Sequence, residues 1–353
     1  MPKHTDIFEN LLQRIRGGAF GPDKRLPSEM ELAQRFRVSR PTAARALRDL
    51  QTMGLIERRV GSGTYLRPSA PPAATRTLGL LVPGLAHTEI LDPVCTHITQ
   101  AAQSQGLGIA LTERATASAK PFIERKVDGV FFAPVETVTD REAINTAIVD
   151  ELRAAGIAVV LLDRDVTEFP RRSRFDLVGI DSFQAAYTLA EHLLDVGHRS
   201  FRFVAKPGYP ATTDLRIAGC REAIERRGIH VDRKWSHFGD PGDEQFVLSL
   251  LKGKPDVIVC SNDLTAALLI QTLTSLGLRV PQDVGVAGFD DVHYATLLST
   301  PLTTVRQPCD AIARAAVATT LSRIENPHLP PRQVLLAGEL VVRQSCGGKR
   351  RTR

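Results

Sequence analysis

The sequence predicts an α/β protein with two parts: a small amino-terminal winged helix-turn-helix and a larger domain whose two lobes are built on parallel sheets. Three observations support this prediction. The net charge of +6 is confined to residues 1–67, which hold 13 Lys and Arg against 7 Asp and Glu, whereas residues 68–353 hold 32 of each sign. Proline and alanine dominate residues 67–77. Apolar runs then alternate with amphipathic segments in a chain of 353 residues, which exceeds the usual size of one core.

Two helices are predicted before residue 37. Apolar residues recur at helical spacing between Ile7 and Ile15, and Gly17-Gly18 ends the pattern. Ser28 can begin a second helix, because its hydroxyl accepts hydrogen bonds from free first-turn amides. The residues that this second helix is expected to bury are Leu32, Ala33 and Phe36.

A third helix is predicted after Ser39, another capping residue. Pro41 is tolerated in its first turn, where amides have no intrahelical partner. One side of this helix carries Ala43, Ala46, Leu47, Leu50 and Met53, and the opposite side carries Pro41, Arg45, Arg48 and Thr52. Two strands at 55–60 and 64–66, joined through Gly61-Ser62-Gly63, complete the pattern of a winged helix-turn-helix.

The outward side of the third helix suits duplex DNA. The major groove is about 12 Å wide and admits one helix, and arginine can donate two hydrogen bonds to guanine there. Glycines at the hairpin tip let the main chain approach phosphates, and Arg58 and Arg59 supply charge nearby. The positive excess of residues 1–67 fits a polyanionic partner. A module for protein contacts and a merely solvated basic surface are the alternatives.

Residues 68–77 are predicted to be an extended linker, because their composition gives no apolar periodicity. The apolar runs beyond it occupy 78–82, 107–111, 129–133, 157–162, 176–180, 201–205, 256–260 and 284–288. Amphipathic helices are expected between them at 183–196, 215–227 and 264–276. Continuous apolar strands, each followed by a helix, indicate parallel sheets covered on both faces. About 280 residues is large for one sheet of this kind, so two lobes are expected.

Polar residues follow several of these runs directly. In paired α/β lobes, ligands bind at the carboxyl ends of the strands, in the crevice between the lobes. The residues in this position are Asp163, Arg164, Asp181, Asn262, Asp263, Asp290 and Asp291. Carboxylates accept hydrogen bonds from hydroxyls, and arginine and asparagine bond neighbouring oxygens, so the pattern favours a polyhydroxylated ligand. Asp181, Asn262 and Asp291 are equally placed to cap the helices that follow.

The sequence carries no signature of a metal site, cofactor or catalytic motif. Its five cysteines lie far apart, with Cys260 in an apolar run, and its nine histidines have no metal-ligand spacing. Neither a nucleophile elbow nor a phosphate-binding loop of the Walker type occurs. The first residues contain no uninterrupted apolar signal, and no apolar run reaches 18 residues. We therefore expect a cytoplasmic binding protein; an enzyme using two cleft aspartates and a solute receptor are the weaker alternatives.

Residues 5–67 resemble the DNA-binding domain of the GntR family of bacterial transcription regulators. An LPSE start, a VSR-x-T turn and a G-x-GT wing occur in the family's order and spacing. Met30 and Ala44 depart from the family, since many members carry arginine at both positions; Arg45 follows one position later. The resemblance implies that Ser28 touches phosphate, that Ser39, Arg40, Pro41, Thr42 and Arg45 lie at the groove, and that Gly61, Ser62 and Gly63 form the wing tip.

Residues 78–345 are similar to the effector-binding and dimerisation domain of the LacI/GalR regulators, which is periplasmic-binding-protein-like. The segments that carry this resemblance are VDGVFFAP, GHRSFRFVA, DLRIAGCREAI, PDVIVCSNDLTA, PQDVGVAGFDD and PLTTVRQP. By resemblance, the ligand contacts are Asp163, Arg216, Asn262 and Asp290. Candidates for a ring that stacks on the ligand are Phe122, Phe175 and Phe289. The chain is expected to cross between lobes near 175, 306 and 327–332, and residues 346–353 are expected to form a basic tail.

The combined pattern resembles that of arabinose-responsive regulators. It implies a homodimeric, DNA-binding transcriptional repressor whose operator affinity is controlled by a small ligand, most simply a sugar, in the cleft between two lobes. The first lobe, including the predicted helix at 89–105, is the expected dimer surface. An activator, a corepressor-dependent regulator, and a purine or sugar phosphate as ligand are the alternatives that the sequence leaves open.

Overall fold

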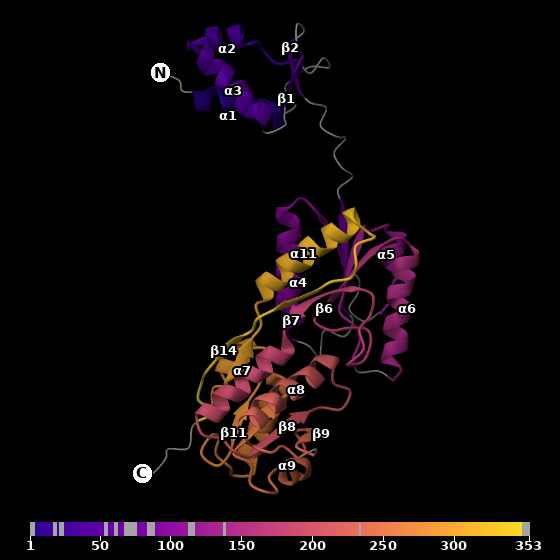
Figure 1. The fold of residues 1–353 in the computed structure, drawn as a ribbon, viewed down its shortest axis with the longest axis vertical. Coiled ribbons are helices and arrows are strands. Elements are labelled where there is room, and N and C mark those ends of the chain that lie inside the picture. The colour runs from indigo at the N-terminus through magenta and orange to yellow at the C-terminus, as the bar shows by residue number, and fades with distance from the viewer. Residues whose placement is uncertain are drawn as a thin grey trace. The chain divides into compact units, whose positions relative to one another are not determined.

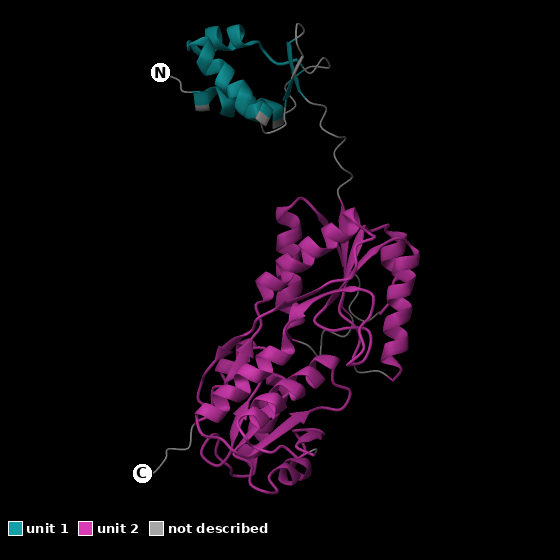
Figure 2. Ribbon diagram, viewed as in Figure 1, with its two compact units in different colours: residues 1–75 teal, residues 76–353 magenta. Residues whose placement is uncertain are grey.

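The computed structural model describes residues 4–16, 20, 25–52, 56–59, 63–66, 76–82, 89–111, 117–136, 139–232 and 234–347. The chain divides into two compact units, residues 1–75 and residues 76–353 (Figure 2). No helix within the described ranges combines the length and the apolar character needed to cross a membrane.

Unit 1 contains three helices and a two-stranded hairpin. The helices are α1 (His4–Arg16), α2 (Glu29–Phe36) and α3 (Arg40–Thr52), and the antiparallel strands are β1 (Ile56–Arg59) and β2 (Gly63–Leu66). Ser28 caps α2 through a capping box, in which its hydroxyl accepts from the amide of Glu31 and the Glu31 carboxylate accepts from the amide of Ser28. The core consists of fully buried Ile7, Leu11, Leu32, Ala43, Ala46, Leu47 and Leu50, together with Leu26 and Ile56. The predicted winged helix-turn-helix is confirmed.

The first lobe of unit 2 contains a sheet of six parallel strands in the order β13-β7-β6-β5-β3-β4. These strands are β3 (Thr77–Leu81), β4 (Gly108–Leu111), β5 (Gly129–Phe132), β6 (Ala158–Leu162), β7 (Asp176–Ile180) and β13 (Gln333–Leu336). Helices α4 (Leu91–Ser104) and α11 (Cys309–Glu325) cover one face, and α5 (Lys120–Glu124) and α6 (Arg141–Ala154) cover the other (Figure 1). Because both faces of the sheet are buried, the sequences of its strands are continuous apolar runs.

The second lobe contains four parallel strands in the order β11-β10-β8-β9. They are β8 (Phe201–Ala205), β9 (Ser236–Phe238), β10 (Val257–Cys260) and β11 (Gly285–Ala287). The helices are α7 (Ser182–Asp195), α8 (Ala211–Arg226), α9 (Glu244–Leu250) and α10 (Asp263–Ser275), followed by the 3₁₀ turn η2 (His293–Thr296). Two parallel-stranded lobes confirm the predicted α/β class.

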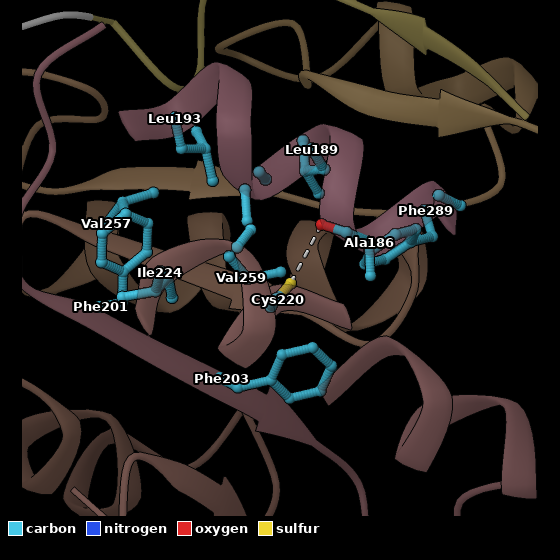
Figure 3. Packing of buried hydrophobic residues seen from close by; sticks show 14 of the residues in the cluster. Ala186, Leu189, Leu193, Phe201, Phe203, Cys220, Ile224, Val257, Val259 and Phe289 are labelled. Carbon is cyan, nitrogen blue, oxygen red and sulfur yellow. Dashed lines mark hydrogen bonds between the residues drawn. The ribbon is translucent and has the colours of Figure 1, made fainter. Parts of the chain in front are cut away.

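Helices α7 and α8 pack closely in the core of the second lobe. In Figure 3, Cys220 of α8 faces α7, and its thiol donates a hydrogen bond to the carbonyl oxygen of Ala186 at 3.5 Å. Gly219 permits this approach, because a Cβ atom there would lie 2.2 Å from the carbonyl oxygen of Phe183. Burial raises the pKa of the Cys220 thiol, so this cysteine stays protonated within the core.

The chain crosses between the two lobes three times. It passes from β7 to α7, from β12 (Thr304–Arg306) to α11, and from β13 to β14 (Glu339–Val341), which pairs with β12. The third crossing therefore lies between residues 336 and 339, not at 327–332 as expected, because the chain first adds β13 to the first-lobe sheet. The first crossing follows residue 180 rather than 175, since all of β7 belongs to that sheet. Cys346, expected in the tail, is buried in the second-lobe core.

Candidate functional site

Helix α3 presents a basic, exposed face on unit 1. Its buried residues Ala46 and Leu50 lie on one side. At about 100° per residue, Pro41, Arg45 and Arg48 lie on the opposite side. All three are exposed, as is Arg40 at the start of the helix. Arg45 lies nearer the centre of the exposed face than Ala44.

Hydroxyl groups order the starts of α2 and α3. The Ser39 hydroxyl lies 2.8 Å from the Thr42 hydroxyl and accepts from the Thr42 amide at 3.4 Å. Ser28 uses a lone pair to cap α2, so its own O–H proton stays available to a phosphate oxygen. The structure thus places Ser28, Ser39 and Thr42 at two exposed helix starts.

The predicted wing is described only in part. Arg58 belongs to β1, while Gly61 and Ser62 lie outside the described residues. Gly63 begins β2 at a φ of +133°, and a Cβ atom there would come within 3.2 Å of Nε of Arg25. This position therefore favours glycine for its backbone conformation, whereas the exposed Arg25 side chain could shift to admit a Cβ atom.

A cavity of about 270 Å³ lies between the two lobes of unit 2. It is formed at the carboxyl ends of strands from both lobes. In the first lobe, Glu136 comes after β5 and Asp163 after β6; in the second lobe, Lys206 directly follows β8 and Ser261 directly follows β10. All four ligand contacts implied by resemblance line this cavity: Asp163, Arg216, Asn262 and Asp290. The structure therefore brings together residues that are up to 127 positions apart in the sequence.

On the first-lobe side, Asp163 offers an acceptor to the cavity. Its backbone is left-handed, with φ at +67°. Nε of Arg164 donates to Oδ2 of Asp163 at 3.0 Å, and Nη2 of Arg164 lies 2.9 Å from the same oxygen. Oδ1 of Asp163 is buried and has no hydrogen-bond partner among the described residues. Burial raises the pKa of Asp163 to about 6, and the charge of Arg216 opposes this rise. Arg164 also contacts the carboxylate of Glu136, which lines the cavity.

On the second-lobe side, Arg216 and Asp290 form a buried pair. Nη1 of Arg216 donates to the carbonyl oxygen of Ser261, and its Nη2 lies 3.5 Å from Oδ1 of Asp290. The guanidinium lies 4.6 Å from the ring centroid of Phe289. Gln307, which follows β12 in the lobe connection, donates through Nε2 to the same Asp290 oxygen at 2.8 Å. Burial raises the pKa of Asp290, and Arg216 and Gln307 oppose that rise.

The three residues that could serve as caps differ in their positions. Asp181 is the N-cap of α7, where it accepts from the amide of Gln184, and it does not line the cavity. Asn262 is the N-cap of α10 and also lines the cavity. Asp291 caps no helix; it instead binds Arg306 and Arg343 on the lobe connections, with Oδ2 to Nε of Arg306 at 2.7 Å.

The aromatic residue at the cavity is one that the sequence did not identify. Phe122 is buried against Gly79, Phe175 lines a separate cavity, and Phe289 lies beneath Arg216. Tyr209 is the aromatic side chain among the described lining residues. Its ring stacks on Phe238 at 4.9 Å.

Glu136, Lys206 and Gln307 are further lining residues that the sequence analysis did not single out. Glu136 and Lys206 come within four residues of the end of an apolar strand, which was the available signal, whereas Gln307 follows the short strand β12, which is not an apolar run. A second, mostly apolar cavity shares Ile90, Asp290 and Gln307 with the first. In the described part of the chain, no group of His, Cys, Asp and Glu side chains is arranged to hold a metal ion.

Comparison with known proteins identifies both units. Residues 3–66 match the bacterial regulatory proteins of the gntR family, and residues 190–346 match the periplasmic binding protein-like domain. The chain is 26% identical to the arabinose metabolism transcriptional repressor of Geobacillus stearothermophilus, over 98% of each protein. It is 28% identical to the ribose operon repressor of Haemophilus influenzae, over 77% of this chain and 81% of that protein.

Solved structures resemble large parts of this chain. A LacI family regulator of Enterococcus faecium with bound ribose has a TM-score of 0.64 at 24% identity, covering 77% of this chain and 99% of that one. A complex of the regulator CelR with cellobiose has a TM-score of 0.65 at 22% identity, covering 91% and 100%. These likenesses establish the fold. The chain therefore joins an amino-terminal GntR-type helix-turn-helix domain to a periplasmic-binding-protein-like domain, and it is similar to transcriptional repressors named for arabinose metabolism and for the ribose operon.

Proposed function

We propose that this protein is a transcriptional repressor that releases its operator when a neutral monosaccharide binds between the two lobes of unit 2. The observation that carries the proposal is the cavity in which Asp163, Arg216, Asn262 and Asp290 meet, with an unpartnered Asp163 oxygen. The full-length similarity to an arabinose repressor supports both the role and the ligand class. The function is binding rather than turnover, and a DNA target places the protein in the cytoplasm.

The charges around the cavity favour a neutral ligand over a phosphorylated one. Among the described lining residues, the acidic side chains of Glu136, Asp163 and Asp290 are balanced by three cations. Each cation already lies near a carboxylate: Arg164 near Asp163, Arg216 near Asp290, and Lys206 at 3.9 Å from Asp240. A sugar phosphate would add negative charge with no spare cation to meet it, and its desolvation would be costly.

The size of the cavity favours a single sugar ring. Its volume of about 270 Å³ lies just below the range of about 300–1,000 Å³ that is typical of small-molecule pockets. A disaccharide has about twice as many non-hydrogen atoms as a monosaccharide, so the smaller ligand matches a cavity of this size better. The hydroxyls of one ring can donate to Asp163 and Asp290 and accept from Asn262.

The DNA-binding part of the proposal rests on α3 and the wing. We propose that Ser39, Arg40, Pro41, Thr42 and Arg45 lie at the major groove, that Ser28 binds phosphate, and that Arg58, Gly61, Ser62 and Gly63 act at the wing. One such helix covers few base pairs, so specific binding requires a homodimer that places two helices about 34–36 Å apart. We propose that the first lobe, including α4, forms the dimer surface.

Release requires that the effector bind one conformation of the regulator better than the other. A coupling of roughly 1–3 kcal/mol changes operator affinity by about 5–150-fold, which is enough for induction. The test is calorimetry of the purified protein with arabinose, ribose, xylose, glucose and galactose. Heat with at least one sugar, and weaker operator binding when that sugar is present, is the expected result. No heat with any of them would rule out the neutral monosaccharide.

A further inference from the structure

Arg141 lies outside the effector cavity but ties the two lobes together beside it. It begins α6 of the first lobe, and its side chain is 26% exposed. Nη1 of Arg141 donates to the carbonyl oxygen of Tyr209 at 2.6 Å and to that of Gly208 at 3.3 Å, both in the second lobe. Nη2 lies 3.4 Å from Oε1 of Glu168, which keeps the guanidinium on the first-lobe side.

The segment that Arg141 holds is one wall of the cavity. Residues 206–210 follow β8, and all five line the cavity. The second lobe holds this segment through Tyr209, whose ring stacks on Phe238 and whose hydroxyl donates to Asp214 at 3.3 Å. The first lobe holds the same segment by its backbone, through Arg141. Separation of the lobes would therefore have to break the Arg141 hydrogen bonds.

The stability of α6 does not account for an arginine at this position. A cation in the first turn is opposed by the positive amino-terminal end of the helix dipole. The residue before it, Asp140, has a left-handed backbone and makes no capping hydrogen bond that would offset this effect. The partners of Arg141 are instead carbonyl oxygens and a carboxylate outside the helix, and two of the carbonyls belong to the other lobe.

We propose that Arg141 is a positioning residue that holds the cavity closed over the effector by fixing residues 206–210 against the first lobe. This inference rests on the proposed function for the existence of a cleft effector, but the contact itself exists in the protein alone. Arg141 is not itself a lining residue of the cavity and acts on it only through the residues that it bonds. Its loss should therefore speed the escape of the effector more than it slows entry.

The experiment compares full-length Arg141→Ala and Arg141→Lys with Arg153→Ala. Arg153 lies on the same helix, and its one ion pair within the described ranges is with the exposed Asp150, so its variant is a matched control for charge. The first measurement is amide hydrogen exchange of residues 204–212 without any sugar. We expect exchange about tenfold faster in Arg141→Ala, a smaller change in Arg141→Lys, which loses the forked geometry, and none in Arg153→Ala.

The second measurement is the dissociation rate of whichever of arabinose, ribose, xylose, glucose and galactose binds the wild type. An increase of about tenfold in Arg141→Ala, with unchanged thermal stability, supports the proposal. If none of these sugars binds, the proposed ligand class is wrong. The hydrogen-exchange data alone then test whether Arg141 fixes residues 206–210 against the first lobe. Exchange in residues 204–212 that matches the wild type in both Arg141 variants would overturn the inference.

Discussion

Replacing Asp163 with asparagine removes one acceptor from the effector cavity with little change in volume. Nε of Arg164 donates to Oδ2 of Asp163, so the amide oxygen of asparagine will stay on that side to keep accepting from it. The amide nitrogen then occupies the position of Oδ1, which has no partner in the wild type. A donor thus faces the effector hydroxyl where an acceptor stood.

The expected loss follows from the hydrogen bond that disappears. A hydrogen bond to a charged group contributes roughly 1.5–3 kcal/mol, so the dissociation constant of the sugar should rise by about 10–150-fold. Operator binding without sugar should stay within about twofold of the wild type, because the substitution lies in unit 2 and changes no residue of the reading helix.

Calorimetry with the sugar that binds the wild type measures this change. The matched control is Asp181→Asn, which makes the same chemical change at an N-cap outside the cavity, where asparagine caps equally well. Unfolding curves of both variants check that the fold is retained. An Asp163→Asn protein that binds the sugar as tightly as the wild type would refute the role assigned to this carboxylate.

Three further predictions address DNA binding, pH and stability. Arg40→Ala should abolish the preference for the operator, whereas Arg58→Ala should weaken binding to operator and random DNA alike. Fluorescence anisotropy across a salt series measures both effects. Unchanged operator affinity in Arg40→Ala would contradict the assignment. Burial raises the pKa of Asp163 to about 6, so its carboxylate becomes protonated as the pH falls through that value. The sugar affinity of the wild type should therefore weaken between pH 7.5 and pH 5. An equally steep pH profile in Asp163→Asn would count against this cause. Arg323→Ala removes the forked hydrogen bonds to Asp176, whose side chain is fully buried, but leaves it the amide and the guanidinium of Arg332. The free energy of unfolding in urea titrations should therefore fall by about 1.5–3 kcal/mol, and a loss under about 0.5 kcal/mol would argue against this cost.

Local pattern predicts the regular elements of this protein well. Helix α3 could be placed from Ser39 and the apolar positions that it buries, because capping and helical periodicity act over a few residues. Strands β7 and β8 could be placed at their observed bounds, because burial on both faces leaves a continuous apolar run. Asp163, Asn262 and Asp290 could be expected at one edge from the rule that parallel strands end at the same side.

Features that depend on long-range placement could not be predicted in this way. Strand β13 is short and has alternating exposure, and its apolar residues 334–336 carry no signal of which strand they will pair with. Its place beside β7, and with it the third lobe crossing, is set by tertiary pairing. Tyr209 reaches the cavity because its ring packs on Phe238, which is 29 residues further along the chain. The contact of Arg141 with residues 208 and 209 joins two lobes, and no local signal in the sequence relates them.

The most direct test of the whole account is operator binding by the full-length protein with and without a saturating sugar. The protected promoter DNA is first mapped by footprinting, and its dissociation constant is then measured by anisotropy at fixed salt. The account predicts an increase of about 5–150-fold on addition of the sugar, and no increase with Asp163→Asn at a concentration that saturates only the wild type. An operator affinity that is the same with every sugar at saturation would contradict it.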